Sequence, residues 1–368
     1  MRLLHLRSSE FFGGPERAIL GQCKALSGFD IFCASFVRDN LPNQFLDKCK
    51  KENIKALPIL ESYTGDFSVT GKLKNLLLEN EIDILVTHDY KANFFGHRAC
   101  ASGPTVHASH YRGRTRENFK VRLYNFIDDF MLKRIKHIIA VSEASKKLLV
   151  SLRIKQERIT VIPNAFNISK LTGGEIENEG EENGLVSIIS AGRLSHEKGF
   201  DLLLEAFAMA GRMQRPVKLF IYGEGPEETK LKELSEKLYL TGKVEFCGFS
   251  NKLLDIYKQM SFLVLPSRSE GMPNVVLEAW SQKLGVVAAS VGGVPEMIEQ
   301  GKSGLLCEPE NINDLASKIK YAVDNPQEMK KFGLAGFRLL FDKYNFETQA
   351  KQLSAYYKRI VEQESQTR

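Results

Sequence analysis

The chain has 368 residues, 43% of them hydrophobic and 26% charged, a composition that excludes fibrous and intrinsically disordered proteins. This length exceeds what one hydrophobic core normally supports, so it predicts two domains. The formal net charge of +6 is too small an excess for a dedicated nucleic-acid-binding protein.

The placement of charges and cysteines adds to this picture. Residues 1–165 contain 26 Lys and Arg against 17 Asp and Glu, a net charge of +9, whereas the remainder has a net charge of −3. The basic first half suggests an anionic partner. The six cysteines are scattered without a Cys-x-x-Cys pair, which favours reduced thiols over disulfides or a zinc site. No apolar run approaches the roughly 20 residues of a membrane-spanning helix, and the first residues are too charged for a secretory signal, so we expect a cytoplasmic protein.

In the first half, short apolar runs alternate with helix-period segments. The expected strands are residues 2–6, 29–36, 54–59, 82–88, 105–110, 137–142 and 158–163. Buried strands rich in Val and Ile, separated by amphipathic helices, are typical of a parallel, doubly wound sheet. Residues 1–165 are therefore predicted to form a Rossmann-like domain.

Two features of this half follow strands, where open parallel sheets bind their ligands. Gly13 and Gly14 precede Pro15, an expected helix start, and glycines there let the backbone approach a diphosphate, although glycines also simply make turns. His107 and His110 face opposite sides of one strand, and His110 lies nearer its carboxyl end, which makes it the better candidate. A lone histidine at a strand end is more often structural than functional.

A basic stretch at residues 112–122 leads into an apolar stripe formed by Leu123, Phe126, Ile127, Phe130 and Met131. Two interpretations stay open. Residues 112–136 could form a peripheral patch for anionic lipid or for a lipid-linked, phosphate-bearing acceptor. The alternative, a core helix with a solvated basic face, is the more common outcome for such a pattern.

The alternation of strands and helices stops at residues 172–184, which hold five glutamates and four glycines without periodicity. Such a segment is typical of a solvated loop, so we place a linker at 166–184. A second Rossmann-like domain is expected at 185–344, with strands at residues 185–192, 217–225, 243–249, 261–267, 285–290 and 303–309. Residues 345–368 form an amphipathic segment with no strand after it, which predicts a helix able to pack back on the first domain.

In the second domain, Arg193 follows a strand and Lys198 precedes a helix that opens at Gly199. Two cations beside a helix N-terminus, with a glycine that allows close approach, form a good anion site. Two solvated cations at a strand–helix corner are an equally acceptable interpretation.

A second candidate follows the strand at residues 261–267. Pro273 suits the first position of a helix, which places Glu270 in the preceding loop and Glu278 on the second turn. The free backbone N–H groups at Asn274 and Val275 can receive a phosphate. Because that phosphate would repel a carboxylate, Glu270 and Glu278 should instead bind hydroxyls on either side of a nucleotide-sugar diphosphate. For an isolated glutamate, a helix-dipole complement or a solvated face would be the default.

Missing motifs exclude several other classes. The sequence contains no Asp-x-Asp pair that could bind a divalent ion, so we expect no metal or other cofactor. Arg193, Lys198 and the helix N-terminus would offset the diphosphate charge instead. Neither Gly-x-Gly-x-x-Gly nor a P-loop is present, which argues against nicotinamide oxidoreductases and P-loop NTPases. Gly-x-Ser-x-Gly and His-Glu-x-x-His are also missing, which leaves hydrolases unsupported.

The chain closely resembles the retaining GT-B glycosyltransferases of family 4, also called group 1 glycosyl transferases. The resemblance covers most of the chain and is carried by GGPER, VHASH, AVSEASKKLL, VIPNAFN, SAGRLSHEKGFDLLLEAF, IYGEGP, EGMPNVVLE, GVVAASVGGVPEMI and GLLCEP. It departs at Ala165 and Phe166, where many members have Gly-Val. It implies two Rossmann-like, doubly wound parallel-sheet domains facing an interdomain cleft, with the C-terminal helix crossing back onto the first domain.

Residue by residue, the resemblance implies a donor site and a reacting centre. Arg193 and Lys198 would bind the diphosphate, and His110 would lie beside the donor sugar. Glu270 would hold hydroxyls of that sugar, and Glu278 would hold the ribose. Catalysis is thus expected from His110, Arg193, Lys198 and Glu270. The other implied donor-binding residues, with the base near the Gly248 turn, are Gly13, Gly14, Gly248, Phe249, Gly271, Met272, Pro273, Asn274 and Val275.

The resemblance also implies a reaction. A hexosyl-type sugar would move, with retention of anomeric configuration, from a nucleotide-diphosphate sugar to a hydroxyl of a glycan, a lipid-linked molecule or a small molecule. The setting would be cell-surface glycan or glycolipid assembly, in the cytoplasm or peripherally on the inner face of the membrane. Two alternatives stay open: a nucleotide-sugar epimerase of the same fold, and a non-catalytic nucleotide-sugar-binding partner of a membrane synthase.

Overall fold

The architecture comes from a computed structural model of the chain. The structure describes residues 1–38, 41–63, 65–113, 119–168, 171, 184–211 and 214–367, without the side chains of 119–123 and 367. These residues form two compact units. The first contains the chain up to Asn164 together with the segment from Phe346 onward, and the second contains the chain from Ala165 to Asn345. Most of the expected linker at 166–184, and residues 114–118 of the basic stretch, lie outside the described residues.

The first unit is built on a seven-stranded sheet with the order β3-β2-β1-β4-β5-β6-β7, in which every neighbouring pair is parallel. Its strands are β1 (Arg2–Leu6), β2 (Asp30–Val37), β3 (Lys55–Leu60), β4 (Ile84–Thr87), β5 (Val106–Tyr111), β6 (His137–Ala140) and β7 (Ile159–Val161). A parallel arrangement brings all carboxyl ends to one edge of the sheet, where the loops that carry functional residues gather.

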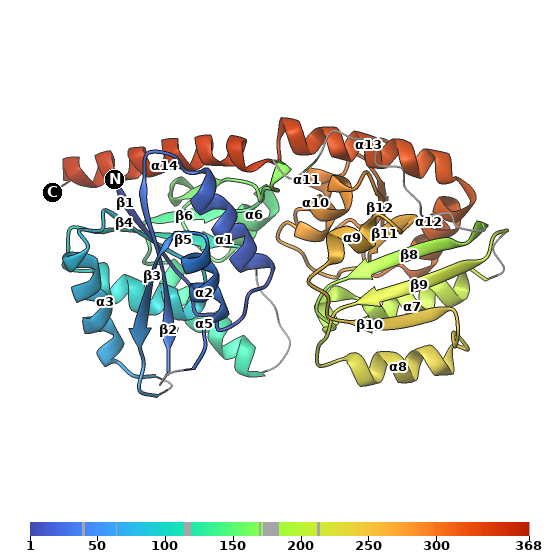
Figure 1. The fold of residues 1–368 in the computed structure, drawn as a ribbon, viewed down its shortest axis with the longest axis horizontal. Helices are drawn as coiled ribbons and strands as arrows, with labels where there is room; N and C mark the ends of the chain where they lie inside the picture. Colours follow the sequence, from blue (N-terminus) through green and yellow to red (C-terminus); the bar gives the residue numbers. More distant parts are fainter. Residues whose placement is uncertain are drawn as a thin grey trace. The chain divides into compact units, whose positions relative to one another are not determined.

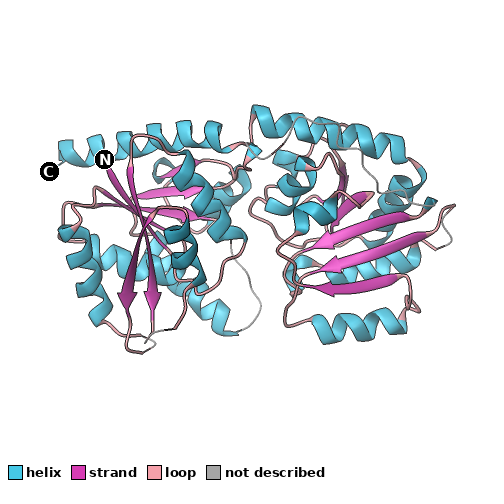
Figure 2. Cartoon of the chain, in the orientation of Figure 1, coloured by secondary structure: helices cyan, strands magenta, loops and turns pink. Residues whose placement is uncertain are grey.

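Helices cover both faces of this sheet, as Figures 1 and 2 show. They are α1 (Gly14–Ala25), α2 (Gln44–Lys51), α3 (Ser68–Glu79), α4 (Tyr90–Cys100), α5 (Phe119–Leu132), α6 (Glu143–Ser151), the 3-10 turn η1 (Gln156–Arg158) and the C-terminal α14 (Phe346–Thr367). Alternation along β1 assigns the faces: Leu4 packs with Leu73 and Phe95 of α3 and α4, whereas Leu3 packs with α14.

Helix α14 belongs to the first unit although it follows the second unit in the sequence. Its Leu353 and Tyr357 are fully buried in the core formed with Leu3. A glycine in α1 permits this approach, because a Cβ at Gly21 would lie only 2.1 Å from the ring of Phe346. The amphipathic stripe of the last segment is thereby removed from water.

The second unit has a six-stranded sheet with the order β10-β9-β8-β11-β12-β13, again parallel throughout. Its strands are β8 (Val186–Ala191), β9 (Val217–Tyr222), β10 (Val244–Gly248), β11 (Phe262–Leu265), β12 (Gly285–Ala289) and β13 (Leu305–Cys307). Its helices are α7 (Phe200–Met209), α8 (Glu228–Lys237), α9 (Leu253–Tyr257), α10 (Asn274–Ser281), α11 (Val294–Met297), α12 (Ile312–Asp324) and α13 (Pro326–Asp342), with a 3-10 turn η4 (His196–Lys198).

Two parallel α/β sheets confirm the predicted fold class. Two helix starts differ from the prediction by one residue. Helix α1 begins at Gly14 rather than at Pro15, and α10 begins at Asn274 because Pro273 keeps an extended backbone (φ −74°, ψ 119°) and serves as the N-cap. Over the described part of the chain, no helix combines the length and apolar character needed to cross a bilayer.

Candidate functional site

The loop after β8 carries the two predicted cations of the second unit. Arg193 is exposed two residues beyond the strand, and Lys198 ends the 3-10 turn η4. Gly199 follows with a φ of +67°, a backbone conformation that L side chains rarely adopt. A Cβ at Gly199 would also lie 2.2 Å from the carbonyl oxygen of Pro266. Glycine at this position therefore lets the loop after β8 lie directly against the end of β11.

This close approach brings Lys198 into contact with Glu270, two residues that the sequence motifs assign to the same donor site. Lys198 Nζ donates to Glu270 Oε1 over 2.6 Å, and the Ser267 hydroxyl donates to the same oxygen over 2.7 Å. The Glu270 side chain is only 7% exposed, whereas that of Lys198 is 26% exposed. The second carboxylate oxygen of Glu270 makes neither of these bonds, so the pair presents an ammonium and a carboxylate oxygen side by side.

Arg268 fixes the same two loops and was not predicted from the sequence. Its guanidinium forms a two-pronged ion pair with Asp201, with N–O distances of 2.7 and 2.6 Å. It also donates to the carbonyl oxygen of His196 over 2.9 Å and to Glu310 over 2.9 Å, while its backbone N–H donates to the Glu197 carbonyl. These contacts bracket Lys198 on both sides. The hydrogen bonds to Asp201 raise the pKa of Arg268, so the guanidinium stays charged.

The loop after β12 supports the backbone of Glu270. Gly292 has a φ of +52°, and a Cβ there would lie 1.7 Å from the Glu270 carbonyl oxygen. Only a glycine allows this approach. The position of the predicted sugar-binding glutamate therefore depends on three loops, those after β8, β11 and β12.

Helix α10 starts immediately after this loop. Asn274 and Val275 are its first two residues, so their N–H groups lack intrahelical acceptors and point out of the helix end. Glu278 lies on the second turn, as predicted, and is partly exposed. Gly271 is partly exposed, whereas Met272 and Pro273 are buried.

The predicted base-binding turn follows β10. Gly248 has a φ of +69°, and its carbonyl oxygen accepts the N–H of Gly223 over 2.8 Å. Phe249 is 61% exposed. The loop after β9 links this turn to the Arg193 loop, because the Leu194 N–H donates to the Glu224 carbonyl over 3.0 Å.

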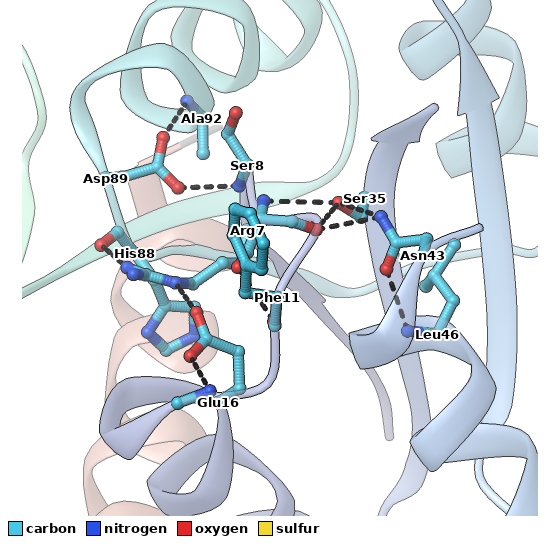
Figure 3. Close-up of polar contacts among 12 residues, drawn as sticks. Arg7, Ser8, Phe11, Glu16, Ser35, Asn43, Leu46, His88, Asp89 and Ala92 are labelled. Atoms are coloured by element: carbon cyan, nitrogen blue, oxygen red, sulfur yellow. Dashed lines mark hydrogen bonds and ion pairs between the residues drawn. The ribbon is translucent and has the colours of Figure 1, made fainter. Parts of the chain in front are cut away.

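In the first unit, Gly13 and Gly14 form the start of α1. Glu16 folds back so that its Oε2 accepts the Gly13 N–H over 2.9 Å, while its Oε1 accepts Arg7 Nε over 2.6 Å (Figure 3). Although burial raises it, the pKa of Glu16 is lowered overall by the charge and hydrogen bond of Arg7. The glycine loop is thus held by a buried ion pair that sequence reasoning did not anticipate.

Side chains from the loops after β2 and β4 fix the rest of this loop, as Figure 3 shows. Asp89 accepts the Ser8 N–H over 2.6 Å and also caps α4 by accepting the Ala92 N–H. Asn43 donates to the Ser9 carbonyl over 2.8 Å. Asn43 and Asp89 are the N-caps of α2 and α4, and an Asp or Asn just before a helix is the sequence signal that could have identified these anchors.

His110 lies on β5 in the same unit and is 1% exposed. Its ring is 5.5 Å from that of His88, measured between centroids, and His88 in turn bonds to His5 over 2.9 Å. Burial, then the positive charge of Arg112, lowers the pKa of His110 well below its usual value, so its imidazole is neutral at pH 7. His107 faces the other side of the sheet and bonds to the Thr87 hydroxyl over 2.9 Å, which agrees with the alternation along the strand.

The predicted site residues are therefore divided between the two units, and two of them are in direct contact. Lys198 and Glu270 are in direct contact, and the remaining second-unit candidates line the carboxyl edge of its sheet at β8, β10 and β11. Gly13, Gly14 and His110 belong to the first unit. Within the described residues, no three His, Cys, Asp or Glu side chains gather in a way that could hold a metal ion, so metal independence stays a prediction.

Two parallel α/β domains, with cations and carboxylates at the carboxyl edge of the second sheet, are the architecture of the GT-B class. Residues 12–170 match the family "Glycosyltransferase Family 4", and residues 175–338 match "Glycosyl transferases group 1". An uncharacterised glycosyltransferase of Haemophilus influenzae is 30% identical over 324 residues, which cover 86% of this chain and 88% of that protein. The chain belongs to the group 1 glycosyl transferases and is a glycosyltransferase.

Further similarities agree with this membership. A 2-deoxystreptamine glucosyltransferase of Streptomyces kanamyceticus is 25% identical over 253 residues, covering 66% of this chain and 65% of that protein. Among solved structures, HepE of Anabaena in complex with UDP-glucose superposes with a TM-score of 0.83 at 20% identity, covering 96% of this chain and 98% of that one. At 20% identity, the similarity to HepE supports the fold alone.

Proposed function

We propose that the protein transfers a hexosyl-type sugar from a nucleotide-diphosphate sugar to a hydroxyl acceptor, with retention of anomeric configuration and without a metal ion. The observation that carries the proposal is the 2.6 Å contact between Lys198 and Glu270, placed before the N-terminus of α10. An ammonium suits a diphosphate, and a carboxylate suits sugar hydroxyls. Both groups beside one helix end match the two parts of a nucleotide-sugar donor.

Similar proteins support the choice of donor. The relative from Streptomyces kanamyceticus is named as a glucosyltransferase, and the HepE structure contains UDP-glucose. Other relatives are named for amino-sugar transfer to a polymer or a lipid: a poly(ribitol-phosphate) alpha-N-acetylglucosaminyltransferase and a phosphatidylinositol N-acetylglucosaminyltransferase subunit. We propose by analogy that this chain acts in cell-surface glycan or glycolipid assembly.

The chemistry would rest on leaving-group stabilisation. As the bond between sugar and diphosphate breaks, negative charge grows on the phosphate oxygens, where Arg193, Lys198 and the first N–H groups of α10 can offset it. We propose that the acceptor hydroxyl attacks from the side on which the diphosphate departs, and that a phosphate oxygen takes its proton. Glu270 would hold the sugar during this step, and His110 would lie beside it.

We also propose a membrane contact through α5. The predicted apolar stripe divides in the structure: Met131 is 4% exposed, but Phe126 and Phe130 are 70% and 50% exposed. The Arg134 guanidinium lies 3.3 Å from the centroid of the Phe130 ring. Exposed aromatic rings beside cations suit an anionic lipid surface. Sedimentation with phosphatidylglycerol liposomes that is lost in Phe126→Ser/Phe130→Ser protein would support this contact, and no sedimentation with any liposome would refute it.

A thermal-shift screen against UDP-, GDP- and ADP-sugars, followed by product analysis, tests the proposed reaction. We expect one nucleotide sugar to raise the melting temperature, and transfer to an acceptor to continue in excess EDTA with the anomeric configuration retained in the NMR spectrum. Inversion or a strict metal requirement would contradict the mechanism. Conversion of the donor without any acceptor would indicate an epimerase, and binding without either transfer or slow hydrolysis would indicate a non-catalytic partner.

A further inference from the structure

A cluster of buried nitrogen-bearing side chains lies at the carboxyl ends of β1, β4 and β5 in the first unit. His5, His88 and His110 are 0%, 6% and 1% exposed, and Arg112 follows directly after β5. The ring of His88 lies 5.1 Å from that of His5 and 5.5 Å from that of His110, measured between centroids. Arg112 is partly exposed, so the cluster reaches the protein surface through it.

Several nitrogens of this cluster are buried without a hydrogen-bond partner in the described part of the protein. They are both ring nitrogens of His110, Nδ1 of His88, Nε2 of His5, and Nε and Nη2 of Arg112. Arg112 makes one bond, from Nη1 to Asn164 Oδ1 over 3.1 Å. Each neutral imidazole has one donor and one acceptor nitrogen, so the unpaired donors are Nε and Nη2 of Arg112, one nitrogen of His110 and one nitrogen of the His5–His88 pair. Because buried polar groups are nearly always paired, these donors indicate a missing acceptor.

The nearby carboxylates already have other partners. Glu16 accepts Arg7 over 2.6 Å and the Gly13 N–H over 2.9 Å, and Asp89 accepts the Ser8 N–H over 2.6 Å. Burial lowers the pKa of Arg112 to about 10, so its guanidinium is still charged at pH 7. The charge of Glu16 favours the protonated form of Arg112, but the Glu16 oxygens are bonded to Arg7 and Gly13, so a bound anion would supply the acceptors that Nε and Nη2 of Arg112 lack.

We propose that His88 and Arg112 bind an oxyanion group, a phosphate or a carboxylate, on the acceptor substrate, next to His110 at the proposed donor sugar. This inference rests on the proposed function, because it assigns a substrate class to the unit that does not hold the donor cations. An oxyanion presents two or three acceptor oxygens. Arg112 offers N–H groups from Nε and Nη2, and His88 offers one more from Nδ1 when its Nε2 accepts the hydrogen bond from His5.

The test is a titration of inorganic phosphate into 15N-histidine-labelled Lys198→Ala protein, in which the proposed diphosphate site of the second unit is disabled. The chain has seven histidines, and their ring resonances report binding at the cluster directly. We expect saturable shifts of the cluster resonances, a loss of phosphate affinity of at least 10-fold when Arg112→Gln is added, and a smaller loss with Arg112→Lys. Arg98→Gln is the matched control, because Arg98 is exposed and lies over Phe94 of α4 instead.

The outcomes separate this inference from the proposed function. Unchanged phosphate affinity in the Arg112→Gln protein, with a folded NMR spectrum, would overturn it, as would equal shifts with neutral glycerol. In otherwise wild-type protein, Arg112→Gln should leave nucleotide-sugar affinity within 2-fold while raising the KM for the acceptor. A parallel loss of donor affinity would assign the cluster to the donor and also overturn the inference. Failure of the proposed function would instead appear as no nucleotide-sugar binding by the wild-type protein.

Discussion

Replacing Gly292 by alanine tests whether the backbone geometry around Glu270 sets donor recognition. The added Cβ would lie 1.7 Å from the Glu270 carbonyl oxygen, whereas real Cβ atoms essentially never approach closer than 3.0 Å. The difference requires a displacement of at least about 1.3 Å between the two loops. A misplacement of about 1 Å can cost about 100-fold in rate, so we expect kcat/KM to fall by about two orders of magnitude.

Gly301→Ala provides the matched control for this substitution. Gly301 also has a left-handed backbone, with a φ of +71°, but nothing lies within 4 Å of a Cβ built there. Both variants should lose about 1–2 kcal/mol of unfolding free energy from the left-handed conformation of alanine. Only Gly292→Ala should also lose activity.

The assay compares binding of the selected nucleotide sugar with binding of the free nucleoside diphosphate by calorimetry. Because Glu270 is proposed to hold the sugar, Gly292→Ala should weaken the nucleotide sugar by at least 10-fold and the free diphosphate by much less. Equal weakening of both ligands, or equal activity of the two alanine variants, would refute the reasoning.

Three further predictions address the cations and the buried histidines. Lys198→Ala or Arg193→Ala should lower turnover at saturating donor at least ~100-fold, a loss of about 2.7 kcal/mol or more, and full activity would exclude their role. Arg268→Ala should weaken donor binding about 10-fold with partial rescue by lysine; a lower melting temperature with unchanged donor affinity would reduce Arg268 to a structural residue. Burial lowers the pKa of His5 from 6.5 to about 3, so only the unfolded chain takes up this proton as the pH falls below 6.5. The stability that His5 contributes is therefore complete above pH 6.5 and should fall by about 2 kcal/mol at pH 5. Urea unfolding at the two pH values should show that the free energy of unfolding falls by about 2 kcal/mol less in His5→Asn than in the wild-type protein. Parallel pH profiles of the two proteins would contradict this prediction.

Much of the fold could be predicted because its signals are local. Each strand is a short apolar run between helix-period segments, and burial on both faces makes such runs continuous rather than alternating. Lys198 and Glu270 could be placed at one edge because both lie in loops that follow strands of a parallel sheet. Their direct contact additionally requires β8 and β11 to be neighbours, which the sheet order shows.

The supporting contacts could not be predicted, because they join residues far apart in the chain. Arg268 and Asp201 are 67 positions apart, and Asp89 and Ser8 are 81 apart. Each side chain alone resembles an ordinary surface charge, and only the folded topology brings the partners together. For a related reason, the sequence could not show that Met131 of α5 is buried while Phe126 and Phe130 are exposed. Residue spacing on a helix does not say which part of its apolar face the rest of the protein covers.

A crystal structure with the nucleotide sugar selected by the thermal-shift screen tests the central claim most directly. We predict that the diphosphate lies within hydrogen-bond distance of Lys198 Nζ, the Arg193 guanidinium and the first N–H groups of α10, with sugar hydroxyls on Glu270 and ribose hydroxyls on Glu278. A diphosphate bound elsewhere on the second unit, or one held by a metal ion in place of these cations, would contradict the account.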